Sequence, residues 1–180
     1  MASIKILVAG HFGAGKTTFV KTASSNTALT TEKRVFHPSE RQEKSTTTTA
    51  MDFSNIRLDK QNISIFAIPG QKRFEFMWKI LAKNTRGYIF LFDSTNPKRW
   101  SETLEQFEMF MEAQPAPYVF VANKQDLPEA RSVKEIRETL SVSSSVKFLP
   151  CVATDRDTVL NILMILLEEI KIREGKHEYT

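Results

Sequence analysis

The sequence predicts an α/β fold, with a doubly wound, mostly parallel six-stranded sheet that has one antiparallel strand at its edge. Short, nearly continuous apolar runs alternate along the chain with stretches of helical period. Strands that are covered on both faces of a parallel sheet have this composition. Since 180 residues suffice for one domain with a substantial core, we expect residues 1–180 to form a single domain.

The strands are expected where the apolar runs lie. Two of these segments alternate polar and apolar residues and are separated only by Asp59 and Lys60, which predicts an antiparallel hairpin at the sheet edge. The expected strands are residues 4–9, 50–58, 61–68, 87–92, 118–122 and 146–150.

Helices are expected between the strands, at residues 15–24, 73–83, 101–113, 132–140 and 159–174. The fourth opens with Ser132 and Glu135, the spacing of a capping box. Residues 25–47 are rich in serine, threonine and charge and show no clear period. A loop of this length inside a compact domain is usually functional.

Composition restricts the class of protein. The chain has 25 Lys and Arg against 21 Asp and Glu, too mild an excess to indicate a nucleic-acid partner. The single cysteine, Cys151, excludes an intramolecular disulfide and favours a buried apolar role over a reactive thiol. We find no apolar run of about 18 residues and no lipidation motif. We therefore expect a cytoplasmic protein without an intrinsic membrane anchor.

The segment GHFGAGKT fits the phosphate-loop pattern GxxxxGK[ST] directly after the first predicted strand and at the start of a helix. Its glycines allow backbone N–H groups to point at phosphate oxygens, and the helix N-terminus adds partial positive charge. Lys16 would reach the β- and γ-phosphates, and the Thr17 hydroxyl would ligate Mg²⁺. His11 could touch the nucleotide, although we favour a solvent-facing side chain. The nucleotide contacts expected here are Gly10, His11, Phe12, Gly13, Ala14, Gly15, Lys16, Thr17 and Thr18.

The segment NKQD, residues 123–126, directly follows the fifth of the strands expected in the central sheet and predicts guanine as the base. The Asp126 carboxylate can accept two hydrogen bonds from guanine N1–H and its 2-amino group, and adenine has no such donor pair. Lys124 would lie along the base, and Asn123 would tie this loop to the phosphate loop. Leu127 is expected to line the same pocket.

The order GHFGAGKT, a threonine-bearing loop, PGQKRF, NKQD and CVATD resembles the Ras-like small GTPases over nearly the whole chain. It is most similar to the prokaryotic branch that includes the MglA gliding-motility and polarity GTPases. The resemblance implies a GTP/GDP switch with Mg²⁺ as cofactor and switch regions at about residues 35–50 and 68–80.

The same resemblance assigns roles to residues. Thr48 would sense the γ-phosphate and contact Mg²⁺, and Gly70 would donate its N–H to that phosphate. Gln71 would orient the attacking water beside Lys16. The Ala153 N–H would bind guanine O6, with Thr154 next to it.

Three positions depart from the family pattern. Ala67 stands where an aspartate usually holds Mg²⁺ through a water, and Asp52 is either its substitute or an ordinary solvent-exposed acid. Phe12 replaces a small glycine and would crowd an arginine supplied by a partner. Thr47 stands where the MglA-type proteins place a built-in arginine, and nothing shows that Arg41 or Lys44 replaces it. Because such an arginine is worth about 10³–10⁵ in kcat, we expect slow hydrolysis by the isolated chain.

Partners follow from the resemblance as well. The switch regions would contact an activating protein, by analogy a roadblock-type dimer, and effector proteins. The apolar residues of segment 74–81 either face a partner or cover the sheet. The alternative function is a guanine-nucleotide-binding interaction module with negligible hydrolysis, which Ala67 and Phe12 motivate and Gln71 and Thr48 oppose.

Overall fold

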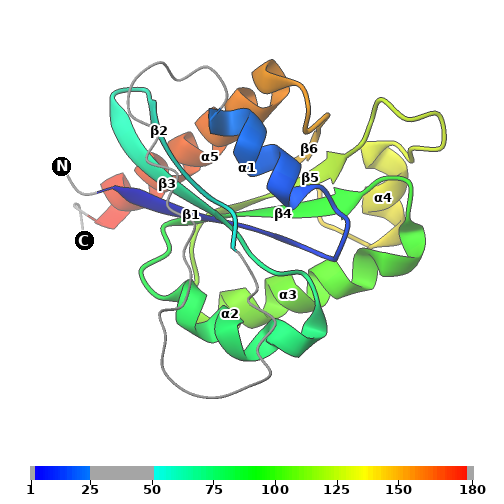
Figure 1. The fold of residues 1–180 in the computed structure, drawn as a ribbon, viewed down its shortest axis with the longest axis horizontal. Coiled ribbons are helices and arrows are strands. Elements are labelled where there is room, and N and C mark those ends of the chain that lie inside the picture. Colours follow the sequence, from blue (N-terminus) through cyan, green and yellow to red (C-terminus); the bar gives the residue numbers. More distant parts are fainter. Residues whose placement is uncertain (1–2, 25–50, 178–180) are drawn as a thin grey trace, which may run out of the picture.

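A computed structural model describes residues 3–24 and 51–177 of the chain and contains one six-stranded sheet (Figure 1). The strand order is β2-β3-β1-β4-β5-β6. Neighbouring strands are parallel except β2 and β3, which are antiparallel. The predicted α/β fold with an antiparallel edge strand is therefore confirmed. The strands are β1 (Ile4–Gly10), β2 (Phe53–Leu58), β3 (Gln61–Ala67), β4 (Gly87–Asp93), β5 (Tyr118–Asn123) and β6 (Phe148–Pro150).

Helices cover both faces of the sheet. Helices α1 and α5 lie on one face, and α2 and α3 lie on the other (Figure 1). The helices are α1 (Lys16–Ser24), α2 (Glu75–Ala82), α3 (Trp100–Ala113), α4 (Val133–Thr139) and α5 (Arg156–His177). The start of β1 and the last turns of α5 lie at the same end of the sheet, so the carboxyl ends of the parallel strands meet at the opposite end. Within the described ranges, no helix is long and apolar enough to cross a bilayer.

Local signals explain several boundaries. Asp59 and Lys60 both have positive φ values, 49° and 63°, as the tight turn of a two-residue hairpin requires. The Ser132–Glu135 capping box is present at the start of α4, with Ser132 Oγ accepting from the Glu135 N–H at 3.2 Å. The predicted hairpin and this helix start are both confirmed.

Other boundaries were predicted wrongly. Helix α5 begins at Arg156 rather than 159, because the Asp155 carboxylate accepts hydrogen bonds from the N–H groups of its first turn. That turn is polar, so it lacks the apolar period on which the prediction depended. The helix expected at 73–83 begins as a 3₁₀ turn, Lys72–Phe74, and becomes α-helical only at Glu75. Strands β2 and β6 are shorter than expected, because only part of each apolar run pairs with a neighbour.

The two faces of the sheet bury different kinds of side chain. Towards α1 and α5 the core is largely aliphatic, with Ile6, Val8, Ile89 and Leu91 among its members. Towards α2 and α3 it is largely aromatic, and ring centroids lie 5–6 Å apart through much of it, as between Phe90 and Phe120 at 5.9 Å. Adjacent residues of one strand therefore supply different cores, as the two-residue period of a strand requires.

Candidate functional site

A pocket of about 650 Å³ lies at the carboxyl ends of the parallel strands, where the phosphate-loop sequence joins β1 to α1. Gly10, Gly13 and Gly15 all have positive φ values, which L residues with side chains rarely adopt. At Gly15 a Cβ atom would also lie 2.2 Å from Asn123 Nδ2. The glycine spacing of the motif is thus required by the backbone and by the close approach of a second loop.

Lys16 is buried beneath this loop. Its Nζ donates to the carbonyl oxygens of Gly10 and His11, both at 2.8 Å. Burial, with a smaller contribution from the nearby Arg99 charge, lowers its pKa from 10.5 to about 8. The ammonium group is therefore held against the loop at a site where negative phosphate would restore its preference for the charged form.

Thr17, the first-turn threonine of α1, donates its hydroxyl hydrogen to the Asp52 carboxylate. Asp52 lies just before β2, and its carbonyl accepts from the Ala67 N–H at 2.8 Å. The hairpin therefore brings the Asp52 carboxylate to the place left open by Ala67, and the three residues line the same pocket. A hydroxyl and a carboxylate are oxygen donors that suit Mg²⁺. No group of three or more His, Cys, Asp or Glu side chains capable of holding a metal occurs in the described part of the chain.

The segment after β3 brings two further predicted residues to the pocket. Gly70 packs so tightly against the phosphate loop that a Cβ would lie 2.6 Å from the Gly10 carbonyl oxygen and 2.7 Å from Lys16 Nζ. Gln71 is half-buried and lines the pocket. Only glycine fits against the loop here, which places the backbone of residue 70 beside Lys16.

Sequence reasoning missed a buried amide from α3. Gln106 Oε1 accepts from the Gly10 N–H at 2.8 Å, and its Nε2 donates to the Gly10 and Gly70 carbonyls at 3.3 and 3.4 Å. Thr103, one turn earlier, accepts from the His11 N–H at 3.1 Å. These polar side chains support the phosphate loop from beneath. The available sequence signal was two polar residues, three positions apart, on one face of a predicted helix.

The NKQD segment meets the phosphate loop as predicted. Asn123 Nδ2 donates to the Ala14 carbonyl at 2.9 Å, and Asn123 Oδ1 accepts from the Ala153 N–H at 2.9 Å. The Ala153 N–H, expected to bind guanine O6, is thus already paired, and binding the base would require it to exchange or share this partner. Asp126 and Leu127 are exposed in this loop, and neither is among the residues that line the 650 Å³ pocket.

Lys124 has a positive φ of 67° and forms an ion pair with Asp93 at the end of β4, with Nζ and Oδ2 2.5 Å apart. Burial would raise the pKa of Asp93, but hydrogen bonds from Lys124 and Thr95 together outweigh it and hold that pKa below its usual value. This fixed ion pair positions the Lys124 stem at the pocket wall.

The expectation that His11 faces solvent is wrong. Its side chain is fully buried, with Nδ1 2.9 Å from the Phe12 carbonyl oxygen and Nε2 3.3 Å from the Asp93 N–H. Burial, opposed by the hydrogen bond to Phe12, lowers the pKa of His11. Its ring thus supports the loop from within the fold.

Several predictions fall outside the described residues: the switch threonine Thr48, and Thr47, Arg41 and Lys44 upstream of it. Of the remaining predicted contacts, Thr18 lines the pocket, Ala14 is buried and Thr154 is exposed. Cys151 is buried, and burial raises the pKa of its thiol to about 12. The buried, apolar interpretation of this cysteine therefore fits the structure better than the reactive one.

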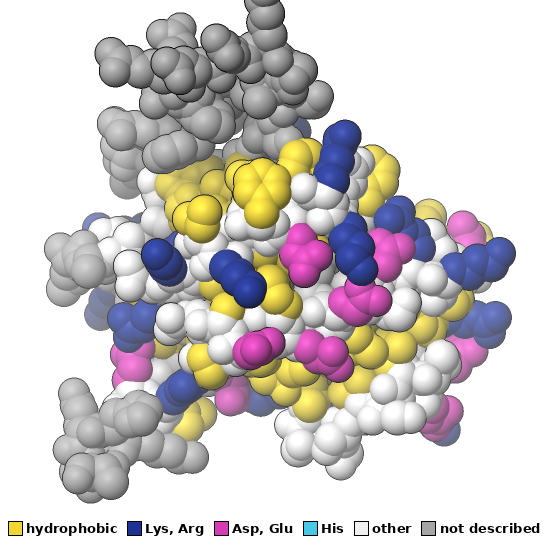
Figure 2. All heavy atoms as spheres, turned by 90° about the horizontal axis from the view of Figure 1, so that it is seen from below, with side chains coloured by type: hydrophobic (Ala, Val, Ile, Leu, Met, Phe, Trp, Pro, Cys, Tyr) yellow, Lys and Arg dark blue, Asp and Glu magenta, His cyan; other side chains and the backbone are white. Residues whose placement is uncertain are grey.

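Segment 74–81 both covers the sheet and faces outwards. Trp78 is buried and donates its Nε1–H to the Pro69 carbonyl at 3.0 Å. Phe76 and Ile80 are 71% and 64% exposed. Seen from the side of α2 and α3, hydrophobic side chains reach the surface among charged ones (Figure 2).

Comparison with known proteins gives a consistent result. The model of the ADP-ribosylation factor family, Arf, matches residues 1–170. ADP-ribosylation factor-like protein 3 of Chlamydomonas reinhardtii is 32% identical over 143 residues, which are 78% of this chain and 73% of that protein. ADP-ribosylation factor-related protein 1 of Rattus norvegicus is 29% identical over 139 residues, or 76% of this chain, and the human protein of that name is 27% identical over 143, or 78%. The match spans about two-thirds of these last two relatives, 66% of the rat protein and 68% of the human one.

Proposed function

Because the chain belongs to the Arf family of small GTPases, we propose that it is a switch that binds GTP and GDP with Mg²⁺ and slowly hydrolyses GTP. The observation that carries the proposal is the contact between Thr17 and Asp52 beside the buried Lys16. It joins a metal-binding hydroxyl, a carboxylate and a phosphate-binding cation within one pocket.

The family match indicates a different branch of the small GTPases from the one that the sequence resemblance indicated. The MglA-type branch is not supported, and neither is the roadblock-type dimer that was inferred from it. We propose only that regulators and effectors of this chain contact its switch regions. The exposed Phe76 and Ile80 on α2 offer them apolar contacts.

Catalysis would consist mainly of positioning and electrostatics. Lys16 and the N–H groups of the phosphate loop bind the phosphates. Thr17 would hold Mg²⁺ directly and Asp52 through a water, and the ion, when bound, supplies positive charge next to the phosphate oxygens. Gln71 would orient the attacking water. We propose Thr48, which lies outside the described residues, as a further Mg²⁺ and γ-phosphate contact.

Single-turnover hydrolysis of GTP tests the activity. Purified protein loaded with GTP and Mg²⁺ is compared with the Gln71→Leu variant by measuring phosphate release. We expect slow release from the original chain and at least about tenfold slower release from the variant, because it cannot orient water. Equal release from both proteins, with or without cell extract, would refute the assignment of Gln71.

The base is tested separately. Asp126→Asn exchanges the carboxylate for an amide that cannot accept both guanine donors, so the variant should lose GTP affinity and gain affinity for xanthosine nucleotides. Unchanged GTP binding would contradict a guanine pocket at this loop.

A second candidate is a nucleotide-binding interaction module that does not hydrolyse GTP. Its support is that Ala67 provides no carboxylate and that Phe12, 56% exposed, lines the pocket where a partner's arginine would enter. The phosphate-release measurement separates the two, because this module would bind GTP tightly and release no phosphate.

A further inference from the structure

The backbone carbonyl of Phe12, in the middle of the phosphate loop, is held by two side chains. Arg99 Nη1 donates to this oxygen at 3.1 Å, and His11 Nδ1 lies 2.9 Å from it. Because His11 Nε2 faces the Asp93 N–H at 3.3 Å, Nε2 is the acceptor and Nδ1 carries the hydrogen. The Phe12 oxygen therefore receives one charged and one neutral donor.

Arg99 is itself braced. Glu102 accepts from Arg99 Nε and Nη2, each at 2.8 Å, one turn along α3. The guanidinium carbon also lies 6.0 Å from the centroid of the Phe12 ring. A bidentate pair of this kind fixes the guanidinium plane. The remaining nitrogen of Arg99, Nη1, therefore points at the Phe12 carbonyl.

Covalent geometry passes this constraint to the next residue. The Phe12 carbonyl and the Gly13 N–H belong to one peptide unit, and no described peptide bond is cis. In a trans peptide these groups point in opposite directions. Gly13 lines the pocket, and no atom lies within 4 Å of the position its Cβ would take. Fixing the carbonyl towards Arg99 therefore turns the Gly13 N–H away from α3 and towards the pocket.

We propose that Arg99, braced by Glu102, is a positioning residue that orients and polarises the Phe12–Gly13 peptide so that the Gly13 N–H donates to the phosphate chain during GTP hydrolysis. This inference rests on the proposed function. In that reaction the water oxygen bonds to the γ-phosphorus, the bond to the β–γ bridging oxygen breaks, the bridging oxygen leaves with GDP, and the water proton passes to the products. Negative charge grows on the departing side, where a fixed N–H donor counts for more than in the ground state.

The arrangement differs from an arginine finger. The guanidinium contacts the back of the loop rather than the phosphates, and its effect passes through a peptide dipole. It also explains how the chain could combine a bulky Phe12 with catalysis, since the aromatic ring packs over the positioning arginine.

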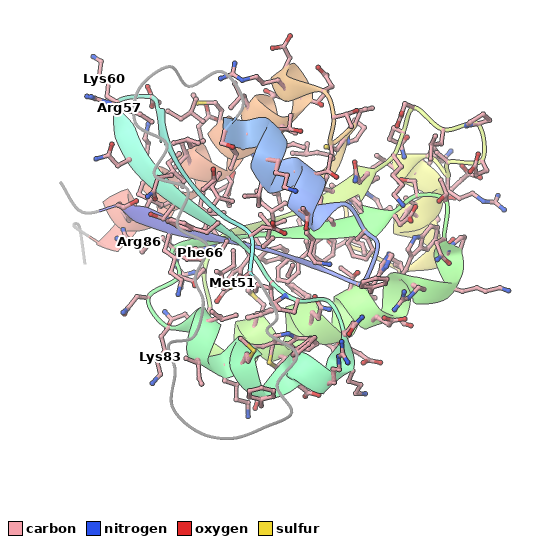
Figure 3. All side chains as sticks on the ribbon, in the orientation of Figure 1. Met51, Arg57, Lys60, Phe66, Lys83 and Arg86 are labelled. Carbon is pink, nitrogen blue, oxygen red and sulfur yellow. The ribbon has the colours of Figure 1, made fainter. Side chains whose placement is uncertain are left out.

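The test compares Arg99→Gln with Arg86→Gln. Arg86 also pairs with a glutamate, Glu174, but lies at the other end of the sheet, beside the start of β1 (Figure 3). We expect Arg99→Gln to lower the single-turnover rate about tenfold while GTP affinity changes less than about threefold, because the donor acts mainly in the transition state. Arg86→Gln should change neither. A loss of affinity as large as the loss of rate, or an unchanged rate, overturns the proposal.

Three further variants separate positioning from simple stability. Glu102→Gln keeps Arg99 but loosens its brace, so the rate should fall less than in Arg99→Gln. The double variant should be no slower than Arg99→Gln alone, since both act through one contact. Arg99→Lys retains the charge and an ammonium donor but not the planar guanidinium fork, and should recover part of the rate. If the rate losses of the two single variants add up in the double variant, Glu102 does not act through Arg99.

A spectroscopic measurement decides the matter even if the original chain proves unable to hydrolyse GTP. The Phe12 carbonyl carbon and Gly13 amide resonances of the nucleotide-free protein are recorded by NMR. Both should shift in Arg99→Gln and stay unchanged in Arg86→Gln. If the chain does not hydrolyse GTP but these resonances shift, the proposed function is wrong and the positioning of the Phe12–Gly13 peptide by Arg99 still holds. If the resonances do not shift, that positioning role is refuted.

Discussion

Asp52→Asn is the sharpest test of the proposed Mg²⁺ site. The substitution keeps the size of the side chain and leaves the backbone contact of residue 52 with Ala67 intact, but it removes the negative charge that accepts the Thr17 hydroxyl. Loss of an outer partner of a metal ligand commonly weakens metal binding about 10- to 100-fold. That range corresponds to about 1.4–2.8 kcal/mol, at about 1.4 kcal/mol per factor of ten.

The assay is the release of a fluorescent GDP analogue as free Mg²⁺ is varied. We expect the Mg²⁺ concentration for half-maximal retention to rise about 10- to 100-fold in Asp52→Asn. Asp59→Asn is the matched control, because Asp59 lies in the same hairpin but pairs with Lys171, away from the pocket. Adding Ala67→Asp to Asp52→Asn should restore part of the affinity by returning a carboxylate to the pocket. An unchanged Mg²⁺ midpoint in Asp52→Asn would show that this carboxylate has no part in holding the metal.

Four other outcomes follow from the described contacts. Since the pKa of Lys16 is about 8 in the nucleotide-free fold, nucleotide binding should take up a proton near pH 8–9, and nucleotide affinity should fall as pH rises above about 8. Calorimetry in buffers of different ionisation enthalpy measures this proton uptake. Binding heats that do not depend on the buffer would contradict it. The same lowered pKa predicts that the nucleotide-free protein gains stability between pH 8 and 10.5, because the unfolded chain binds more protons there. Asn123→Ala removes buried hydrogen bonds to Ala14 and Ala153 and should lower the free energy of unfolding by about 2–4 kcal/mol, as urea denaturation would show. Cys151, with a thiol pKa of about 12, should resist alkylation at neutral pH until the protein unfolds, and rapid labelling of the folded chain would contradict its burial.

Most of the fold was predictable because its signals are local. A strand covered on both faces must be apolar along its length, and β4, buried from Gly87 to Asp93, is apolar almost throughout. The phosphate loop was predictable for the same reason, since all its required residues are adjacent. The start of α5 was not, because Asp155 fixes it through side-chain hydrogen bonds in a polar turn.

The side chains that support the phosphate loop could not be predicted from the sequence. Arg99 and Phe12 are in contact although they are 87 residues apart in the sequence, and no local pattern predicts a contact at that separation. A partial signal existed, because Thr103 and Gln106 are three residues apart and so share one face of α3, and Arg99 directly precedes that helix. Polar residues on the inward face of a helix need buried partners, and here the partners are in the phosphate loop.

The unequal chemistry of the two sides of the sheet has a consequence for how this sequence can vary. Aliphatic side chains towards α1 and α5 can exchange for one another at similar volume with small losses of stability. On the other side, the rings of Phe90, Phe107 and Phe120 meet nearly edge to face, at 84–88°, and an aliphatic replacement would lose both the area and the angular fit. Over long divergence, the half of the molecule that carries α1 and α5 should accumulate substitutions freely, while the half beneath α2 and α3 should keep its aromatic residues.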